Sequence, residues 1–414
     1  MPLSPLLNPK KADMKNIRLP WGAWYGDEER SFELPESWDV SLFELDARHR
    51  VGEQRIAEVL ETLSRDIRAK KPSSAIIVVD DLTRPVQLEE LLPKIVSRLT
   101  AAAVAEKDIR VLIGLGSHAP LSDGDLRKKL GSHIVDRLQC INHNPRETKA
   151  IGMEWGKTEI RLNRHYLAAD YKIVISGLTP HSFAGFSGGA KMLVPGIADM
   201  ETLSKTHKSV LMGFMGQLGT VEQNKFRDTI EGFVERAGLD FFFGLVINPD
   251  RSIRELYGGH YVEAHRAASA EAARFCTLEA DGPYDLVISS AYPKDTELLQ
   301  AENAMIPLKS KKEGLLREGG TLVLMSACSQ GVGHHGLFGE GGKLYRKPRP
   351  LRLLKPYNVA FYVENVDTSG FATVFNEEYF FTDQWSSLLR HITPQLPPSP
   401  RVAVFPYGSM QLVG

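Results

Sequence analysis

A twelve-residue stretch, PHSFAGFSGGAK (residues 180–191), combines residue types that could perform chemistry. His181 stands near its start, Lys191 ends it, and His207 follows sixteen residues later. Small residues between the histidine and the lysine let the backbone approach a bound group closely. The stretch therefore predicts a loop that binds an anion or a flat cofactor and offers a candidate nucleophilic amine.

Known phosphate and metal signatures do not describe this loop. Gly188 and Gly189 are candidate cofactor-binding residues, but an alanine separates Gly189 from Lys191, whereas a P-loop needs lysine directly after glycine and then a hydroxyl. The loop does not match the GxGxxG pattern of NAD sites either. His181 and His207 lack the HxxH or HExxH spacing that places two imidazoles on one helical face for zinc. The spacing alone leaves the identity of the cofactor open.

A second motif is DDLTRP (residues 80–85), which ends one apolar run and begins a helical pattern. Thr83 and the proline suit the first turn of a helix, whose N-terminus attracts anions, and Arg84 adds a bidentate donor. This motif predicts an anion site, with an ordinary capped strand-to-helix turn as the structural alternative.

A third motif, GLGSHAP (residues 114–120), places His118 after two glycines at the end of another apolar run. A single histidine there could be structural, or it could act as an acid–base group, since its charge changes near neutral pH. Both interpretations remain open on the spacing.

Seven short runs of mostly apolar, often β-branched residues must position these motifs. Each is nearly unbroken rather than alternating, which is typical of a strand covered on both faces. Helical stretches such as 85–104 and 306–319 separate most of them, and this alternation indicates a parallel α/β sheet. The predicted strands are 74–81, 109–118, 171–178, 284–293, 320–329, 357–366 and 401–408.

Polar or glycine residues follow the first five predicted strands at once. Ligands of α/β proteins bind at the carboxyl ends of the strands. We therefore predict that the chemistry is gathered from several strand ends into one crevice.

The length of 414 residues fits two domains rather than one core. We predict an N-terminal α/β domain over residues 1–265, a connecting helix and linker over 266–282, and a C-terminal α/β domain over 283–414. Both sheets should be largely parallel, with a cofactor cleft between the domains.

Composition excludes several partners. The net charge is −1 without a long charged run, which gives neither nucleic acid nor a membrane surface electrostatic support. No apolar run approaches the roughly 20 residues of a spanning helix, and the N-terminus lacks a signal-peptide pattern. Three scattered cysteines suit free thiols in a reducing compartment. We predict a cytoplasmic protein with a small-molecule partner, and with neither nucleic acid nor a membrane.

The stretch PHSFAGFSGGAKMLVPG with its following histidine resembles the signature of the nickel-pincer lactate racemase family. The resemblance continues, in the family's order, through DDLTRP, GLGSH, NHNP, AYPKDTELLQ and VAVFPYG. It implies a cofactor of nickel(II) in pyridinium-3,5-bisthiocarboxylic acid mononucleotide, joined as a thioamide to Lys191. His207 matches the histidine that completes the roughly square-planar nickel.

The resemblance also assigns roles to other residues. His118 and His181 match two acid–base histidines on opposite faces of a 2-hydroxy acid. One histidine would take the hydroxyl proton while hydride passes to the cofactor, and return of hydride to the other face inverts C2. Arg84 would orient the substrate carboxylate. Asp81, and with it Thr83, would belong to the cofactor side of the site, where Asp81 would hold the arginine or a cofactor hydroxyl.

The chain departs from the family beyond residue 298. Gln300 matches a glutamine placed near the substrate, but Asn303 stands where lactate racemase carries a lysine, and Leu299 replaces an aromatic residue. An amide in place of a cation weakens binding of a small carboxylate and offers hydrogen bonds to hydroxyls. We therefore expect a racemase or epimerase, an isomerase, for a 2-hydroxy acid larger than lactate, such as a sugar acid. A nickel-pincer oxidoreductase and a non-catalytic binding homologue remain the alternatives.

Overall fold

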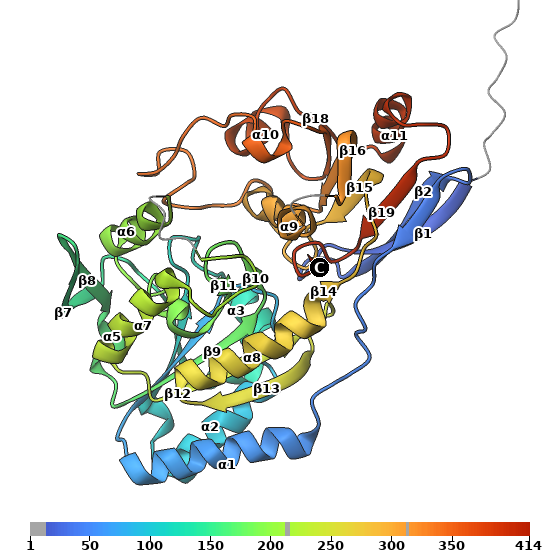
Figure 1. Cartoon of the computed structure of the whole chain (residues 1–414). Coiled ribbons are helices and arrows are strands. Elements are labelled where there is room, and N and C mark those ends of the chain that lie inside the picture. The colour runs from blue at the N-terminus through green and yellow to red at the C-terminus, as the bar shows by residue number, and fades with distance from the viewer. Residues whose placement is uncertain (1–13, 212–215, 312–313) are drawn as a thin grey trace, which may run out of the picture.

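Two six-stranded sheets organise the protein, as the computed structural model shows for residues 14–211, 216–311 and 314–414 (Figure 1). The first sheet has the order β13-β12-β9-β4-β5-β6. All its neighbours are parallel except β13, which is antiparallel to β12. Its strands are β4 (Ala75–Asp80), β5 (Ile109–Gly114), β6 (Gln139–Asn142), β9 (Tyr171–Leu178), β12 (Phe241–Ile247) and β13 (Ile253–Gly259).

The second sheet has the order β18-β17-β16-β15-β19-β3, and all its neighbours are parallel. We call the first sheet with the elements packed on it the first unit, and the second sheet with its elements the second unit. Apolar clusters on the second sheet complete the core of the second unit. Its strands are β3 (Asp39–Leu42), β15 (Tyr284–Ser290), β16 (Leu316–Ser326), β17 (Asn358–Val363), β18 (Phe380–Thr382) and β19 (Arg401–Phe405). The predicted α/β class with largely parallel sheets is confirmed.

Four small ribbons and eleven α-helices surround the two sheets in the described ranges. The ribbons pair β1 (Met14–Trp21) with β2 (Glu28–Pro35), β7 (Thr148–Trp155) with β8 (Thr158–Asn163), β10 (Pro180–His181) with β11 (Gly185–Phe186), and β14 (Thr277–Leu278) with β20 (Leu412–Val413). The helices are α1 (Glu53–Lys70), α2 (Leu91–Ala101), α3 (Asp123–Leu130), α4 (Ser132–Arg137), α5 (Arg164–Ala168), α6 (Met200–Leu211), α7 (Lys225–Ala237), α8 (Tyr261–Cys276), α9 (Ile306–Ser310), α10 (Thr368–Val374) and α11 (Trp385–Ile392). Short 3₁₀ turns are η1 (Glu106–Asp108), η2 (Gly189–Met192), η3 (Leu298–Met305), η4 (Arg352–Leu354) and η5 (Thr393–Gln395).

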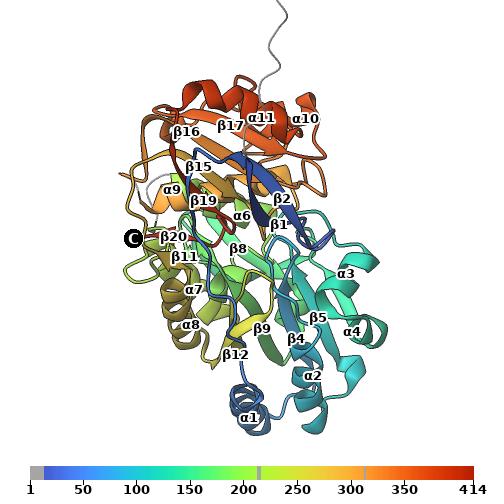
Figure 2. The ribbon, with the colours of Figure 1, turned by 90° about the vertical axis from the view of Figure 1, so that its right-hand side faces the viewer.

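The chain does not divide between the two sheets in simple sequence order. Strand β3 pairs in parallel with β19, and the β1–β2 ribbon packs its apolar face on the second sheet (Figure 2). Helix α8 packs on β12 and β13 of the first sheet. The division at residues 266–282 stays a prediction, with the addition that residues 14–42 associate with the second sheet.

The seven predicted strands are confirmed as β4, β5, β9, β15, β16, β17 and β19. The prediction of a helix over 306–319 is wrong, because α9 ends at Ser310 and β16 begins at Leu316; residues 312–313 lie outside the described ranges. The glycine pair at 319–320 disfavours a helix there. The predicted helix over 85–104 begins only at Leu91, after an irregular turn.

Two negative predictions can be compared with the structure. No helix in the described part of the chain is long and apolar enough to cross a membrane. Cys140, Cys276 and Cys328 are free thiols, two of them buried and Cys140 partly exposed, as predicted.

Candidate active site

A cavity of about 440 Å³ lies where the carboxyl ends of β4, β5 and β9 face the second unit. The two units both contribute to its wall, which confirms the predicted crevice at several strand ends. Nine of the candidate site residues line it: Asp81, Thr83, Arg84, His118, His181, Lys191, His207, Gln300 and Asn303.

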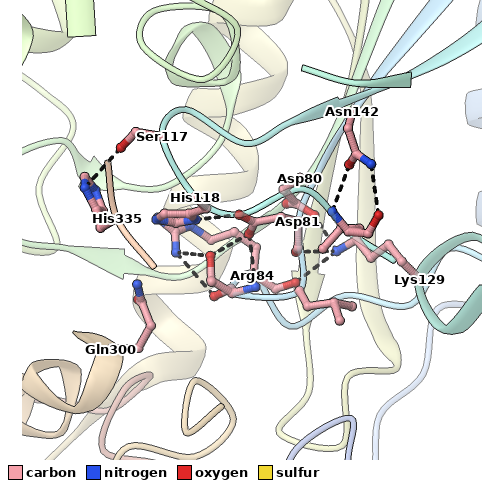
Figure 3. A network of polar contacts seen from close by, with 12 residues as sticks. Asp80, Asp81, Arg84, Ser117, His118, Lys129, Asn142, Gln300 and His335 are labelled. Carbon is pink, nitrogen blue, oxygen red and sulfur yellow. Dashed lines mark hydrogen bonds and ion pairs between the residues drawn. The ribbon is translucent and has the colours of Figure 1, made fainter. Parts of the chain in front are cut away.

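His118 and Asp81 form a hydrogen-bonded pair inside this cavity (Figure 3). The Nδ1–H of His118 donates to Oδ2 of Asp81 at 2.5 Å, and Oδ1 of Asp81 accepts from the amide and the hydroxyl of Thr83 at 3.0 and 2.5 Å. Burial raises the pKa of Asp81, but the neighbouring imidazole and these hydrogen bonds outweigh burial and hold that pKa below its ordinary value. The ionised carboxylate therefore fixes Nδ1 of His118 as the protonated nitrogen, which leaves Nε2 able to accept a proton.

A buried lysine holds the turn that carries Asp81. Lys129 is completely buried, and its Nζ donates to Oδ1 of Asp80 at 2.6 Å and to the carbonyls of Asp81 and Arg84 at 3.1 and 2.9 Å (Figure 3). The second oxygen of Asp80 accepts from the Gly177 amide on β9 at 3.2 Å. This buried ion pair thus joins the 80–84 turn to helix α3 and to the neighbouring strand.

Removing one partner of this pair should destabilise the fold. In Lys129→Met the Asp80 carboxylate loses its counter-charge in the interior, and we expect the free energy of unfolding to fall by about 3–5 kcal/mol. Chemical denaturation checks this, with Lys107→Met as the control, because Lys107 is exposed and its loss should change stability by less than about 0.5 kcal/mol. A Lys129→Met protein as stable as the parent would show that the pair does not hold the turn.

The 180–191 loop takes its shape from side chains behind it. Arg227 of α7 is completely buried, and its guanidinium donates to the carbonyls of Ala184, Phe186 and Gly188 at 3.1, 2.5 and 3.4 Å. The Nε2–H of His265 donates to the Ser187 carbonyl at 2.9 Å. Because these carbonyls point backward to α7 and α8, the loop can present Lys191 and His181 to the cavity.

Gly188 and Gly189 do not lie on the cavity wall. Both have positive φ, 80° and 62°, and a Cβ on Gly188 would lie 2.3 Å from Oγ of Ser176. A Cβ on Gly189 would lie 2.8 Å from the His265 ring. The structure therefore explains these glycines by packing against β9 and α8, and their contact with a cofactor stays a prediction.

Lys191 and His181 share a cationic environment. Burial, together with the charges of Arg84 and Arg227, lowers the pKa of Lys191 to about 7. A large share of this amine is therefore neutral near pH 7, which is the nucleophilic form. Burial and the Lys191 cation also hold the pKa of His181 well below its ordinary value, so this imidazole is neutral.

His207 on α6 has the form of a metal ligand. Its Nδ1–H donates to the Leu203 carbonyl at 2.8 Å, which leaves the Nε2 lone pair free. Burial lowers the pKa of His207 to about 4, so the ring is neutral, as a ligating imidazole must be. No cluster of three or more His, Cys, Asp or Glu side chains suited to a metal occurs in the described part of the chain. His207 and the amine of Lys191 nonetheless line one cavity and so fit a nickel cofactor that needs a single protein ligand and one attachment point.

The 3₁₀ turn η3 carries two side-chain amides that the second unit contributes to the cavity, those of Gln300 and Asn303. Nδ2 of Asn303 donates to the carbonyl and Oε1 of Gln300 at 2.8 and 3.2 Å, so the two amides lie side by side on the wall. The ion pair of Lys309 with Glu302, at 2.6 Å, also borders the cavity. No basic side chain occupies position 303 itself.

Sequence patterns did not assign a role to four side chains at the site. His335 and Phe338, from the second unit, line the cavity, and Ser117 beside His118 bonds His335. In the sequence, His335 is marked only by a glycine-rich stretch with paired histidines (328–342), which predicts a loop that lines the cleft. Glu297 is partly buried near His118, its Oε2 has no hydrogen-bond partner in the described ranges, and burial raises its pKa to about 7.

Parts of this chain are similar in sequence to known lactate racemases. Residues 25–216 match the lactate racemase N-terminal domain. Lactate racemase from Thermoanaerobacterium thermosaccharolyticum is 26% identical over 348 residues, which are 78% of this chain and 77% of that protein. Lactate racemase from Lactiplantibacillus plantarum is 26% identical over 275 residues, covering 65% and 64% of the two chains.

The same fold occurs in two solved structures. The lactate racemase apoprotein from T. thermosaccharolyticum superimposes with a TM-score of 0.75 at 21% identity, over 97% of this chain and 100% of that chain. A protein from Thermotoga maritima superimposes with a TM-score of 0.68 at 19% identity, over 90% and 100% of the chains. The domain match and the two racemase relatives support a lactate racemase-like family for this chain, and the two solved structures show the shared fold.

Proposed function

We propose that the protein is a racemase or epimerase that inverts the C2 centre of a 2-hydroxy acid, using a nickel-pincer nucleotide attached at Lys191. One observation carries the proposal: a single cavity holds a lysine amine with a pKa lowered to about 7, a histidine with a free Nε2, and two further histidines. The names of the two relatives, both lactate racemase, support an isomerase. The free cysteines are consistent with a cytoplasmic enzyme.

The proton transfers fall to His118 and His181. When bound, the cofactor would supply the capacity to take hydride from C2 and return it. His118, whose Nε2 is free, takes the hydroxyl proton of one enantiomer, and Asp81 stabilises the imidazolium that forms. His181 takes or returns the proton on the opposite face.

Binding of the cofactor and the substrate would raise the pKa of His181. Burial, the Lys191 cation and the Arg84 cation all lower the pKa of His181. Conversion of the Lys191 amine to a thioamide removes the first charge, and a substrate carboxylate on Arg84 compensates the second. Both changes raise the pKa of His181, while burial, the largest cause, continues to hold it down.

Arg84 is the proposed anchor of the substrate carboxylate. Its guanidinium lines the cavity and donates through one nitrogen to the carbonyl and hydroxyl of Thr83, at 3.2 Å each, which holds the side chain across the turn. The remaining N–H groups can bind a carboxylate.

The amides of Gln300 and Asn303 support a substrate larger than lactate. We expect Asn303→Lys to raise kcat/KM for lactate relative to a sugar acid such as gluconate by about tenfold, because a cation replaces an amide at the cavity wall. Asn303→Leu should lower kcat/KM for both acids. Because it removes the amide without adding a charge, this variant separates the effect of losing the amide from the effect of gaining a cation. Chiral chromatography of the products measures each rate. A parent enzyme that already prefers lactate would overturn the proposal of a substrate larger than lactate.

The test of the function is racemisation by protein produced together with the cofactor's biosynthetic enzymes. Enantiopure 2-hydroxy acids should each yield the mixed enantiomers or epimers without net oxidation. Accumulation of a 2-keto acid would assign an oxidoreductase instead. Binding of nickel and cofactor without turnover of any 2-hydroxy acid would support the binding homologue.

A further inference from the structure

The loop of residues 331–342, here called the flap, reaches from the second unit onto the first. Its His335 forms a β-bridge with His118, and the amide of Gly336 donates to the Ser117 carbonyl at 2.8 Å. The Ser117 hydroxyl donates to Nδ1 of His335 at 3.0 Å (Figure 3). The rings of His335 and His118 lie 5.2 Å apart, so the flap places a third histidine beside the proposed acid–base pair.

The hydrogen bonds of His335 determine its tautomer. Backbone amides of Leu337 and Phe338 both approach Nδ1 at 3.2 Å, and an amide can only donate. Nδ1 is therefore an acceptor, and in the neutral ring the proton lies on Nε2. Burial, with the neighbouring His118, lowers the pKa of His335 to about 2, which keeps the ring neutral.

The Nε2–H of His335 is thus a hydrogen-bond donor without an acceptor among the described residues. Among the described residues it has no hydrogen-bond partner, although the side chain lines the cavity. It cannot serve as a base, because its only free nitrogen already carries the proton. The proposed roles of His118, His181 and Arg84 also account for the C2 hydroxyl and the carboxylate of the substrate.

We propose that His335 is a specificity-determining residue whose Nε2–H donates a hydrogen bond to a substrate oxygen beyond C2, so that the site selects 2-hydroxy acids hydroxylated at C3. The inference rests on the proposed function. A methyl group at C3, as in lactate, leaves this buried donor unpaired, and a site built to bond a hydroxyl rejects the analogue that lacks it.

Glycerate and lactate make a matched pair of probes, because they differ only by the C3 hydroxyl. The loaded parent enzyme should racemise glycerate with the higher kcat/KM, and His335→Phe should reduce the glycerate-to-lactate ratio of kcat/KM by about tenfold. His335→Gln keeps an N–H at a similar reach and should retain most of the preference. The neighbouring His334 is exposed, so His334→Phe is the control and should leave the ratio unchanged. Equal losses for both acids in His335→Phe would overturn the proposal.

A second measurement does not depend on turnover. Imidazole ¹⁵N NMR of the loaded enzyme should show the Nε2–H tautomer of His335, and glycerate, but not lactate, should shift this resonance. A shift with glycerate in an enzyme that racemises neither acid would refute the proposed function for these acids and keep the hydrogen bond. An Nδ1–H tautomer, or an unchanged resonance while glycerate shifts other signals of the site, would refute the role of His335.

Discussion

Lys191→Ala is expected to lose the cofactor and all racemase activity together. Without the ε-amine no thioamide can form, and the rate should fall by at least about 10⁶-fold, the lower end of enzymatic acceleration. Intact mass spectrometry of the loaded protein should show a mass increase in the parent and none in the variant. Lys191→Arg should behave like the alanine variant, because a guanidinium stays protonated and is a poor nucleophile. The exposed Lys157 provides the control, and Lys157→Ala should load and turn over normally.

The lowered pKa of Lys191 adds a test that needs no cofactor. Only the neutral amine reacts with acetic anhydride, and a pKa of about 7 makes half of this amine neutral at that pH. Acetylation of Lys191 in the unloaded protein should therefore rise up to about pH 7 and then level off, whereas an exposed lysine continues to gain reactivity to about pH 10. Arg84→Leu removes a nearby cation and should move the Lys191 profile to higher pH. Peptide mass spectrometry at a series of pH values measures both profiles.

A mass increase that persists in Lys191→Ala would place the attachment elsewhere and remove the main support for the proposed cofactor chemistry. An unmodified parent, from a host shown to load a lactate racemase, would mean that the chain shares the fold and does not carry the cofactor. Reactivity of Lys191 that keeps rising to pH 10 would mean that the amine is solvated and is not prepared for acylation.

Sequence patterns predicted the strand ends well because local chemistry determines them. The β4, β5 and β9 runs are continuous apolar segments, and the polar residues that end them, such as Asp81 and His118, converge once the strands are parallel neighbours. Strand β12 was missed, although FFFGLVI is as apolar as the others. The fold class, and the convergence of the main motifs in one cavity, could therefore be predicted from periodicity and residue type.

Long-range partners could not be predicted in this way. Lys129 stands in a charged helix, DGDLRKKL, that looks solvated, yet its amine is buried against Asp80, forty-nine positions away. Strand β3 joins a sheet whose other strands begin after residue 283, since parallel pairing needs no proximity in sequence. His335 approaches His118 only because the flap crosses between the units. Such contacts depend on how elements pack, which the spacing of residues does not encode.

Replacing either acid–base histidine should reduce racemisation strongly and by the same factor in both directions. His118→Asn and His181→Asn each remove a proton acceptor, which is worth about 10²–10⁴ in rate. Enantiomers have an equilibrium constant of one, so the ratio of kcat/KM for the two directions is fixed. Neither variant can therefore become slow in one direction alone at steady state. Chiral chromatography from each pure enantiomer checks this, and His133→Asn, at an exposed position, should leave the rates unchanged.

A single turnover separates the two histidines where the steady state cannot. The enantiomer whose hydroxyl faces the remaining histidine can still lose its proton, so keto acid should appear on acid quench from that enantiomer only. His118→Asn and His181→Asn should then show opposite preferences. If both variants yield keto acid from the same enantiomer, the two histidines act on one face, and the two-sided arrangement is wrong. If His181→Asn racemises at the parent rate, His181 serves packing against Phe183, whose ring centroid lies 4.4 Å away, and His118 with Asp81 carries the proton transfer alone.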